Sequence, residues 1–133
     1  MNVSGLRRCL GKKMNKIYQS ALRWIRKHLL LPLIWRCHFS GKQLQKKFKH
    51  AGDFGIVGNY NKFNAEQFKQ ALLNHIINPN TKVIRGSYKG QPVKHFFNPM
   101  TKLNIICDNH KFLSGWLLAP EQEQYLLSNG HLT

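Results

Sequence analysis

Residues 82–118 decide the fold, and they read KVIRGSYKGQPVKHFFNPMTKLNIICDNHKFLSGWLL. They contain four short runs rich in β-branched and aromatic residues, at 82–88, 93–97, 103–107 and 112–118. Short turn signals separate these runs, at 89–92, 98–101 and 108–110. Because no helix-length connection lies between the runs, we expect consecutive antiparallel strands and no parallel sheet.

Before these strands the sequence predicts helices. Ser40, with Gln43 three residues later, predicts the capped start of a short helix over 41–48. Asn64 and Gln67 give a second capping signal, followed by an apolar stripe at three- and four-residue spacings that ends before Asn78. The helices therefore come first along the chain, and the strands follow them.

After the strands the sequence predicts little regular structure. Residues 119–133 predict one more short strand, Gln124–Leu127, and a turn at Asn129-Gly130. The expected fold class is α+β, with N-terminal helices followed by an antiparallel β-sheet of four or five strands.

The positive charge is concentrated near the start of the chain. Of a net charge of +16 over 133 residues, residues 1–50 carry 13 Lys and Arg and no acid, whereas residues 51–133 carry 8 basic and 5 acidic residues. Between 12 and 31 the pattern is that of a basic amphipathic helix, which Pro32 ends. We divide the chain into a basic amphipathic extension, 1–40, and a domain, 41–133. Such a charge favours a polyanionic partner: nucleic acid, an anionic membrane surface or an acidic protein.

The cysteines and the apolar stretches exclude several classes of protein. Cys9, Cys37 and Cys107 have long, irregular gaps, which fit neither a disulfide framework nor a zinc pattern. We expect Cys107 to be a buried, inert thiol and the chain to fold in a reducing compartment. The longest apolar stretch, 29–35, is far shorter than the roughly 20 residues of a transmembrane helix, so we expect neither a membrane span nor a secretory signal.

The acidic residues are too few and too scattered for most metal-dependent chemistry. The chain has five in all, Asp53, Glu66, Asp108, Glu121 and Glu123, and none form a cluster typical of a two-metal nuclease. The sequence also lacks the zinc-deaminase pattern and the phosphate-binding loop of nucleotide hydrolases. We therefore expect no metal and no cofactor.

One histidine lies among residues that suit acid–base chemistry. Residues 46–53 read KKFKHAGD, which places His50 among Lys46, Lys47 and Lys49, with Asp53 three residues later. Neighbouring cations should lower the pKa of His50 and keep it able to act as a base. Asp53 could hold the imidazole in one tautomer, and the lysines could stabilise charge on a phosphorane. These parts suit metal-free RNA cleavage, but spacing alone does not distinguish them from a basic turn.

Three strings resemble one known family. The string KFKHAGDFGI at 47–56 resembles the first signature of the nuclease domain of the colicin D family, and FLSGW at 112–116 resembles its second. FFNPMT at 96–101 resembles a hairpin of the same domain. Their order and approximate spacing agree, and the similarity spans about residues 44–130.

The resemblance implies a microbial-RNase-like toxin architecture and a function. Members of this type are bacteriocins that cleave arginine tRNAs in the anticodon loop without a metal, giving 2′,3′-cyclic phosphate and 5′-OH ends, and so block translation. It implies an acidic immunity protein as partner and action in the bacterial cytoplasm, and we expect a monomer. The resemblance implies catalytic roles for Lys47, Lys49, His50, Asp53, Ser114 and Trp116. We further expect RNA binding by Lys46, Lys47, Lys49 and Trp116.

Strand geometry agrees with these assignments but leaves alternatives open. Ser114 and Trp116 are two residues apart, so on a strand they point to the same face. Trp116 could stack on an unpaired base of RNA, or it could belong to the core. Two other functions also remain: a basic RNA-binding protein without catalysis, and a membrane-active protein that acts through the helix over 12–31.

Overall fold

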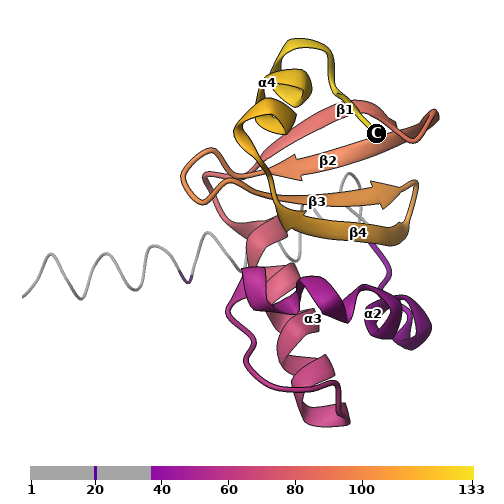
Figure 1. Cartoon of the computed structure of the whole chain (residues 1–133), viewed down its shortest axis with the longest axis vertical. Helices are drawn as coiled ribbons and strands as arrows, with labels where there is room; N and C mark the ends of the chain where they lie inside the picture. Colours follow the sequence, from indigo (N-terminus) through magenta and orange to yellow (C-terminus); the bar gives the residue numbers. More distant parts are fainter. Residues whose placement is uncertain (1–19, 21–36) are drawn as a thin grey trace, which may run out of the picture. The chain divides into compact units, whose positions relative to one another are not determined.

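The computed structural model describes Ser20 and residues 37–133, so the predicted helix over 12–31 lies, apart from Ser20, outside the described residues. The elements below belong to the second of two compact units, Trp35–Thr133. In chain order (Figure 1) they are α2 (Gly41–Lys47), the 3-10 helix η2 (Phe48–Phe54), α3 (Lys62–Ile77), β1 (Lys82–Tyr88), β2 (Gln91–Phe97), β3 (Leu103–Asp108), β4 (Lys111–Leu117), α4 (Pro120–Asn129) and β5 (His131–Leu132). The α+β class is confirmed.

The sheet follows the predicted meander and adds one strand to it. Its order is β4-β3-β2-β1-β5, and the first four strands pair antiparallel with their neighbours. The last strand, β5, instead runs parallel to β1, with Ser87 opposite His131 and Tyr88 opposite Leu132. The prediction of a purely antiparallel sheet is therefore wrong at this edge. Helix α4 is the cause, because it carries the chain back along the sheet so that β5 enters in the direction of β1.

The predicted strand Gln124–Leu127 is also wrong, because these residues lie within α4. Pro120 occupies the first turn of that helix, where a missing N–H costs nothing. The side chain of Gln122 accepts a hydrogen bond from the Ala119 N–H at 3.0 Å. Gly130 ends the helix in the left-handed conformation, with φ 75°. These signals at the two ends outweigh the β-like run between them.

The caps of the earlier helices agree with the sequence in one case and differ in the other. Ser40 caps α2 by accepting from the Gln43 N–H, as predicted. The side chain of Gln43 does not complete a capping box but donates to the carbonyl of Leu113, which ties α2 to β4. Helix α3 begins earlier than predicted, because Asn61 caps it by accepting from the Asn64 N–H at 2.7 Å.

Apolar side chains fill both faces of the sheet. On one face they form a cluster with the end of the chain, made of Val93, Phe97, Ile106, Leu118, Leu126 and Leu132. The alternate strand residues Phe96 and Ile105 are equally buried and belong to the opposite face. There the buried His75 of α3 donates from Nε2 to the Phe96 carbonyl at 2.7 Å, which ties α3 to β2. Helix α4 thus lies on one side of the sheet and α2 and α3 on the other (Figure 1).

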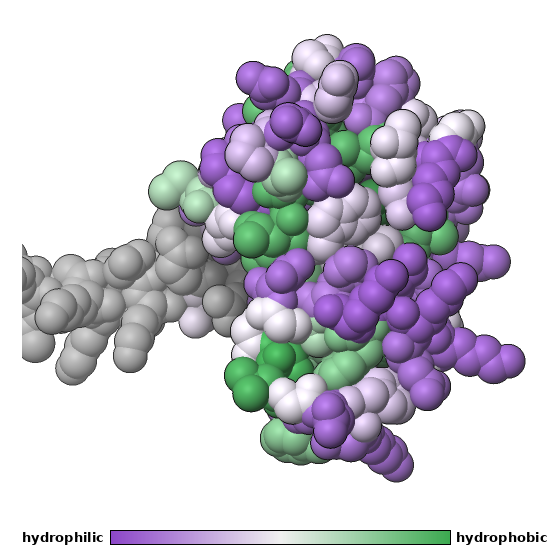
Figure 2. Space-filling view, viewed as in Figure 1, coloured by the Kyte–Doolittle hydropathy of each residue, from purple (hydrophilic) through white to green (hydrophobic). Residues whose placement is uncertain are grey.

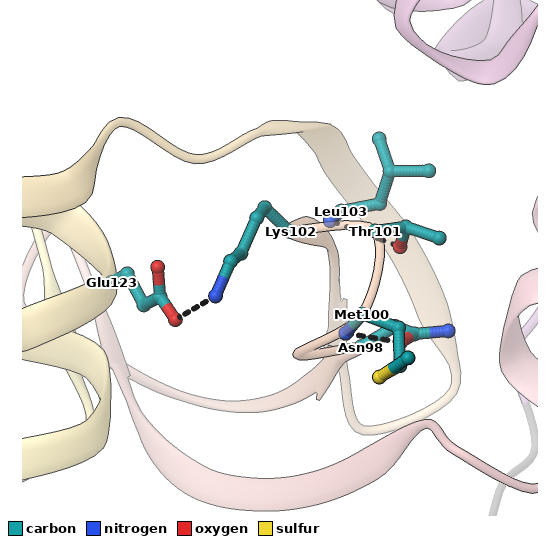
Figure 3. A network of polar contacts seen from close by, with 6 residues as sticks. All are labelled: Asn98, Met100, Thr101, Lys102, Leu103 and Glu123. Atoms are coloured by element: carbon teal, nitrogen blue, oxygen red, sulfur yellow. Dashed lines mark hydrogen bonds and ion pairs between the residues drawn. The ribbon is translucent and has the colours of Figure 1, made fainter.

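Local hydrogen bonds and an ion pair hold the turn between β2 and β3. Asn98 is 2% exposed, and its Oδ1 accepts from the Met100 N–H at 2.9 Å. Lys102, at φ 65°, forms an ion pair with Glu123 at 2.7 Å that joins the turn to α4 (Figure 3). The FFNPMT string therefore forms the end of β2 and this turn.

A disulfide joins Cys37 to Cys107, so the predicted free thiol at Cys107 is wrong. His38 pairs with Lys111, and its carbonyl accepts from the Phe112 N–H at 2.9 Å. This short bridge pairs residues 37–39 with the start of β4, and the disulfide links the same segment to Cys107 near the end of β3. The bond spans 70 positions of sequence, which is why spacing gave no sign of it. The expectation of a reducing compartment loses its basis, because it rested on unpaired cysteines.

Candidate active site

Aromatic contacts fix the segment that carries His50. Phe48, which opens η2, meets Tyr60 at 5.4 Å and Phe68 at 5.8 Å between ring centroids, both edge to face. Phe54, which closes η2, lies 5.8 Å from the same Phe68 ring. Both ends of η2 are thus packed against α3, and His50 lies between them on the side of β4.

His50 and Trp116 lie together although 66 positions separate them in the sequence. Their ring centroids are 5.9 Å apart with an interplanar angle of 35°. The indole Nε1–H donates to Oε1 of Gln122 at 3.2 Å, which fixes the orientation of the ring. Trp116 also packs against the core cluster while remaining half-exposed, so it is partly a core residue and partly open to a ligand.

Asp53 connects the His50 segment to the sheet. Its Oδ2 accepts a hydrogen bond from the Leu117 N–H at 3.0 Å, so it joins η2 to the residue after Trp116. The hydrogen bond that was expected to hold the imidazole goes to the strand instead. The carboxylate still acts on His50 through space, because its charge raises the pKa of that histidine.

Burial and the surrounding cations shift the pKa values of the site. The pKa of His50 lies below its ordinary value, first because of burial and then because of Lys49, and this outweighs the opposing charge of Asp53. The predicted direction is confirmed, although the largest single cause is burial and not a neighbouring cation. The pKa of Lys47 is also lowered, by burial and then by the charges of Lys49, Lys46 and Lys89. His50 is therefore neutral near pH 7 and able to accept a proton.

Two residues of the β1–β2 turn extend this site. The Tyr88 ring lies 5.8 Å from Trp116 at 49°, and the Lys89 Nζ lies 5.3 Å from the centroid of Tyr88. Tyr88 is on β1 and Trp116 is on β4, with two strands between them. A flat sheet would hold these strands about 14 Å apart, so the contact means that the sheet curls until its diagonal corners meet. No local pattern in the sequence marks this contact.

A model of the colicin D family matches residues 43–126. The chain belongs to the colicin D family. It is 42% identical to Colicin-D of Escherichia coli over 88 residues, a match that covers 64% of this chain and 12% of that protein. It also resembles a solved ribonuclease from Escherichia coli complexed with its inhibitor protein, with a TM-score of 0.61 and 37% identity, covering 68% of this chain and all of that one. Both signature strings of the colicin D resemblance, at 47–56 and 112–116, lie inside the matched range.

Within this colicin D-type site, Ser114 lies deeper than the other predicted residues. It is 1% exposed and sits in a cross-strand row with Ile106 and His95. His95 is fully buried, donates from Nε2 to the carbonyls of Ser87 and Gly130 at 3.1 Å each, and accepts at Nδ1 from Asn104 at 3.2 Å. Ser114 therefore belongs to a buried polar group with His95 and Asn104. His50 and the lysines lie at the surface of the site, which we call its rim.

Two features are absent from the part of the chain that the structure describes, a cluster of metal ligands and a membrane-spanning helix. Nowhere in residues 37–133 do three or more His, Cys, Asp or Glu side chains gather as metal ligands would. None of the helices found there has the length and apolar character needed to cross a membrane.

Proposed function

We propose that this chain is a ribonuclease toxin of the colicin D type. The observation that carries the proposal is the pairing of a partly buried His50, whose pKa is lowered, with Trp116 at 5.9 Å between ring centroids and with the charges of Lys47 and Lys49. The matches to Colicin-D and to a ribonuclease bound by an inhibitor protein support it. The chain spans only a small part of the curated relative, so its activity is inferred from this domain alone.

The site residues suit cleavage by transesterification. Neutral His50 takes the proton of a ribose 2′-OH, and the oxygen attacks the adjacent phosphorus. The ammonium groups of Lys47 and Lys49 stabilise the charge that builds on the phosphorane. The bond to the 5′-oxygen then breaks and that oxygen is protonated, which leaves a 2′,3′-cyclic phosphate and a 5′-OH end. The lowered pKa of Lys47 suits it to supply that proton.

The proposed substrate is the anticodon loop of tRNA, with arginine tRNAs as the expected targets. A half-exposed Trp116 beside the acid–base residue suits an unpaired base, since proteins that read RNA sequence bind bases splayed out of loops. Hydrophilic side chains gather over α2 and beside it in Figure 2, next to the segment that carries His50. The reaction needs no metal or cofactor, and the expected setting is the bacterial cytoplasm, where the chain acts as a monomer.

An acidic immunity protein is the proposed partner. The structurally similar ribonuclease is complexed with an inhibitor protein. In this chain the rim of the site carries Lys46, Lys47, Lys49 and Lys89, whose charges act on one another. A protein that covers this rim would need carboxylates opposite these ammonium groups.

The test is to incubate purified chain with total tRNA in EDTA and to map the cleaved ends. His50→Ala should lower the cleavage rate by about 10²- to 10⁴-fold. The matched control His110→Ala, at an exposed turn, should cleave like the wild type. Binding that weakens steeply with salt, without any cleavage by folded wild type, would instead support a non-catalytic RNA-binding protein. Full activity of His50→Ala would also overturn the proposal.

A further inference from the structure

The β1–β2 turn presents the ring of Tyr88 and the ammonium group of Lys89 next to the proposed active site. The Trp116 ring contacts two others, His50 with a centroid distance of 5.9 Å and Tyr88 with one of 5.8 Å. Trp116 is therefore the ring that joins Tyr88 to His50. The Nζ of Lys89 lies 5.3 Å from the Tyr88 centroid.

The positive charge of Lys89 acts on the lysines of the site. Its charge lowers the pKa of Lys47, together with those of Lys49 and Lys46. Like charges held this close repel one another, which destabilises the free protein. The repulsion is relieved when an anion binds among them, so the turn and η2 together suit consecutive phosphates of one strand.

The turn is held in place, although it is exposed. Lys89 has φ 50° and Gly90 has φ 81°, the left-handed pair typical of a tight type I′ hairpin turn. A lysine is uncommon in this conformation, and it is kept there because its N–H donates to the Leu132 carbonyl of β5 at 3.0 Å. The parallel strand β5 thus positions the end of β1.

We propose that Tyr88 and Lys89 form a second nucleotide-binding position, in which Tyr88 stacks on the base next to the one at Trp116 and Lys89 binds its phosphate. The inference rests on the proposed ribonuclease function and extends it to the neighbouring nucleotide. The ligand is unpaired RNA, because stacking on a tyrosine face needs a base that is free of its own helix. The position would contribute to the choice of loop sequence, since it adds a second base to the contact.

The test measures binding of an anticodon stem-loop RNA with 2′-O-methyl groups throughout the loop, which blocks cleavage and leaves binding measurable. Tyr88→Leu keeps apolar volume against Trp116 but removes the ring face, and it should weaken binding by about five- to hundredfold. Tyr88→Phe keeps the face and should bind like the wild type. Lys89→Ala should reduce the dependence of log K on log salt by about 0.7, the value for one lost phosphate contact on a single strand.

Lys82→Ala is the matched control for Lys89→Ala. Lys82 is exposed and begins the same strand, about 20 Å from Tyr88 by the rise of β1, so its removal changes the net charge equally and should leave the salt dependence unchanged. Circular dichroism and thermal melts show that each variant is folded.

Abasic substitutions identify the nucleotide. One abasic residue is placed at each loop position of the RNA in turn, and each RNA is bound to the wild type and to Tyr88→Leu. At the one position whose base stacks on Tyr88, the two proteins should bind with equal affinity, because the abasic residue has already removed that contact. Equal binding by Tyr88→Leu and wild type, or equal salt dependence for Lys89→Ala and Lys82→Ala, would overturn this inference while leaving His50-dependent cleavage intact. Absence of any RNA binding by folded wild type would overturn both proposals.

Discussion

Gly86 is the point at which β1 and the end of the chain come closest. A Cβ added at Gly86 would lie 1.8 Å from the Gly130 carbonyl oxygen, where real contacts stay beyond about 3.0 Å. Both groups are backbone, so no rotamer change relieves the clash. Gly86→Ala must therefore move β5 away from β1 by about 1.2 Å or more.

The expected loss of stability follows from the hydrogen bonds that the Gly130 carbonyl accepts. The Gly130 oxygen accepts from the Ser87 N–H at 2.9 Å and from His95 Nε2 at 3.1 Å. Losing these two bonds costs about 1 kcal/mol each, and forced repacking adds roughly 1–3 kcal/mol. We expect Gly86→Ala to lower the free energy of unfolding by about 3–5 kcal/mol.

The assay is urea denaturation followed by circular dichroism, with Gly41→Ala as the matched control. A Cβ at Gly41 meets nothing within 4 Å, so the same change in composition should leave stability equal or slightly higher. If Gly86→Ala lowers the free energy of unfolding by less than about 0.5 kcal/mol, β5 does not pair with β1 in solution. The support that β5 gives to the turn at Lys89 would then fail as well.

Three further predictions concern the disulfide, acid stability and the site. Cys37→Ser opens a loop with a sequence separation of 70, and loop entropy predicts about 4 kcal/mol less stability in urea under non-reducing conditions; equal midpoints would contradict the bond. Burial lowers the pKa of His75 and of His95, so below pH about 6.5 the unfolded chain binds more protons than the folded one, and the free energy of unfolding should fall as the pH falls. A urea midpoint that stays constant between about pH 7.5 and 5 would exclude this. Asp53→Asn keeps an acceptor for the Leu117 N–H of β4 but removes the charge that raises the pKa of His50. The acidic side of the profile of cleavage rate against pH should therefore move to lower pH, and an unchanged profile would refute the electrostatic coupling of Asp53 to His50.

The local elements could be predicted from the sequence because their signals are local. Alternating and β-branched runs with turn residues between them predicted β1 at its observed bounds and the other three meander strands to within two residues. The pairing of β5 could not be predicted in this way. It depends on two glycines, Gly86 and Gly130, that touch across 44 positions of sequence.

The residues of the site also differ in whether a local stretch of sequence marks them. His50 and Trp116 could be singled out because each lies in a short string that resembles a family signature. Tyr88 and Lys89 lie in an ordinary turn sequence, and only the curl of the sheet brings them to Trp116. Ser114 could be placed on the correct face by its spacing, but its burial depends on packing that no spacing encodes.

The disulfide also changes what a single break in the backbone would do. The loop between η2 and α3 exposes Val57, which is 90% accessible and an easy target for a protease. A cut there separates His50 from Trp116 along the backbone, yet one piece contains Cys37 and the other Cys107. The two pieces remain one covalent molecule until a reductant reaches the sulfur bond. The nicked protein would run as a single band without reductant and as two bands with it.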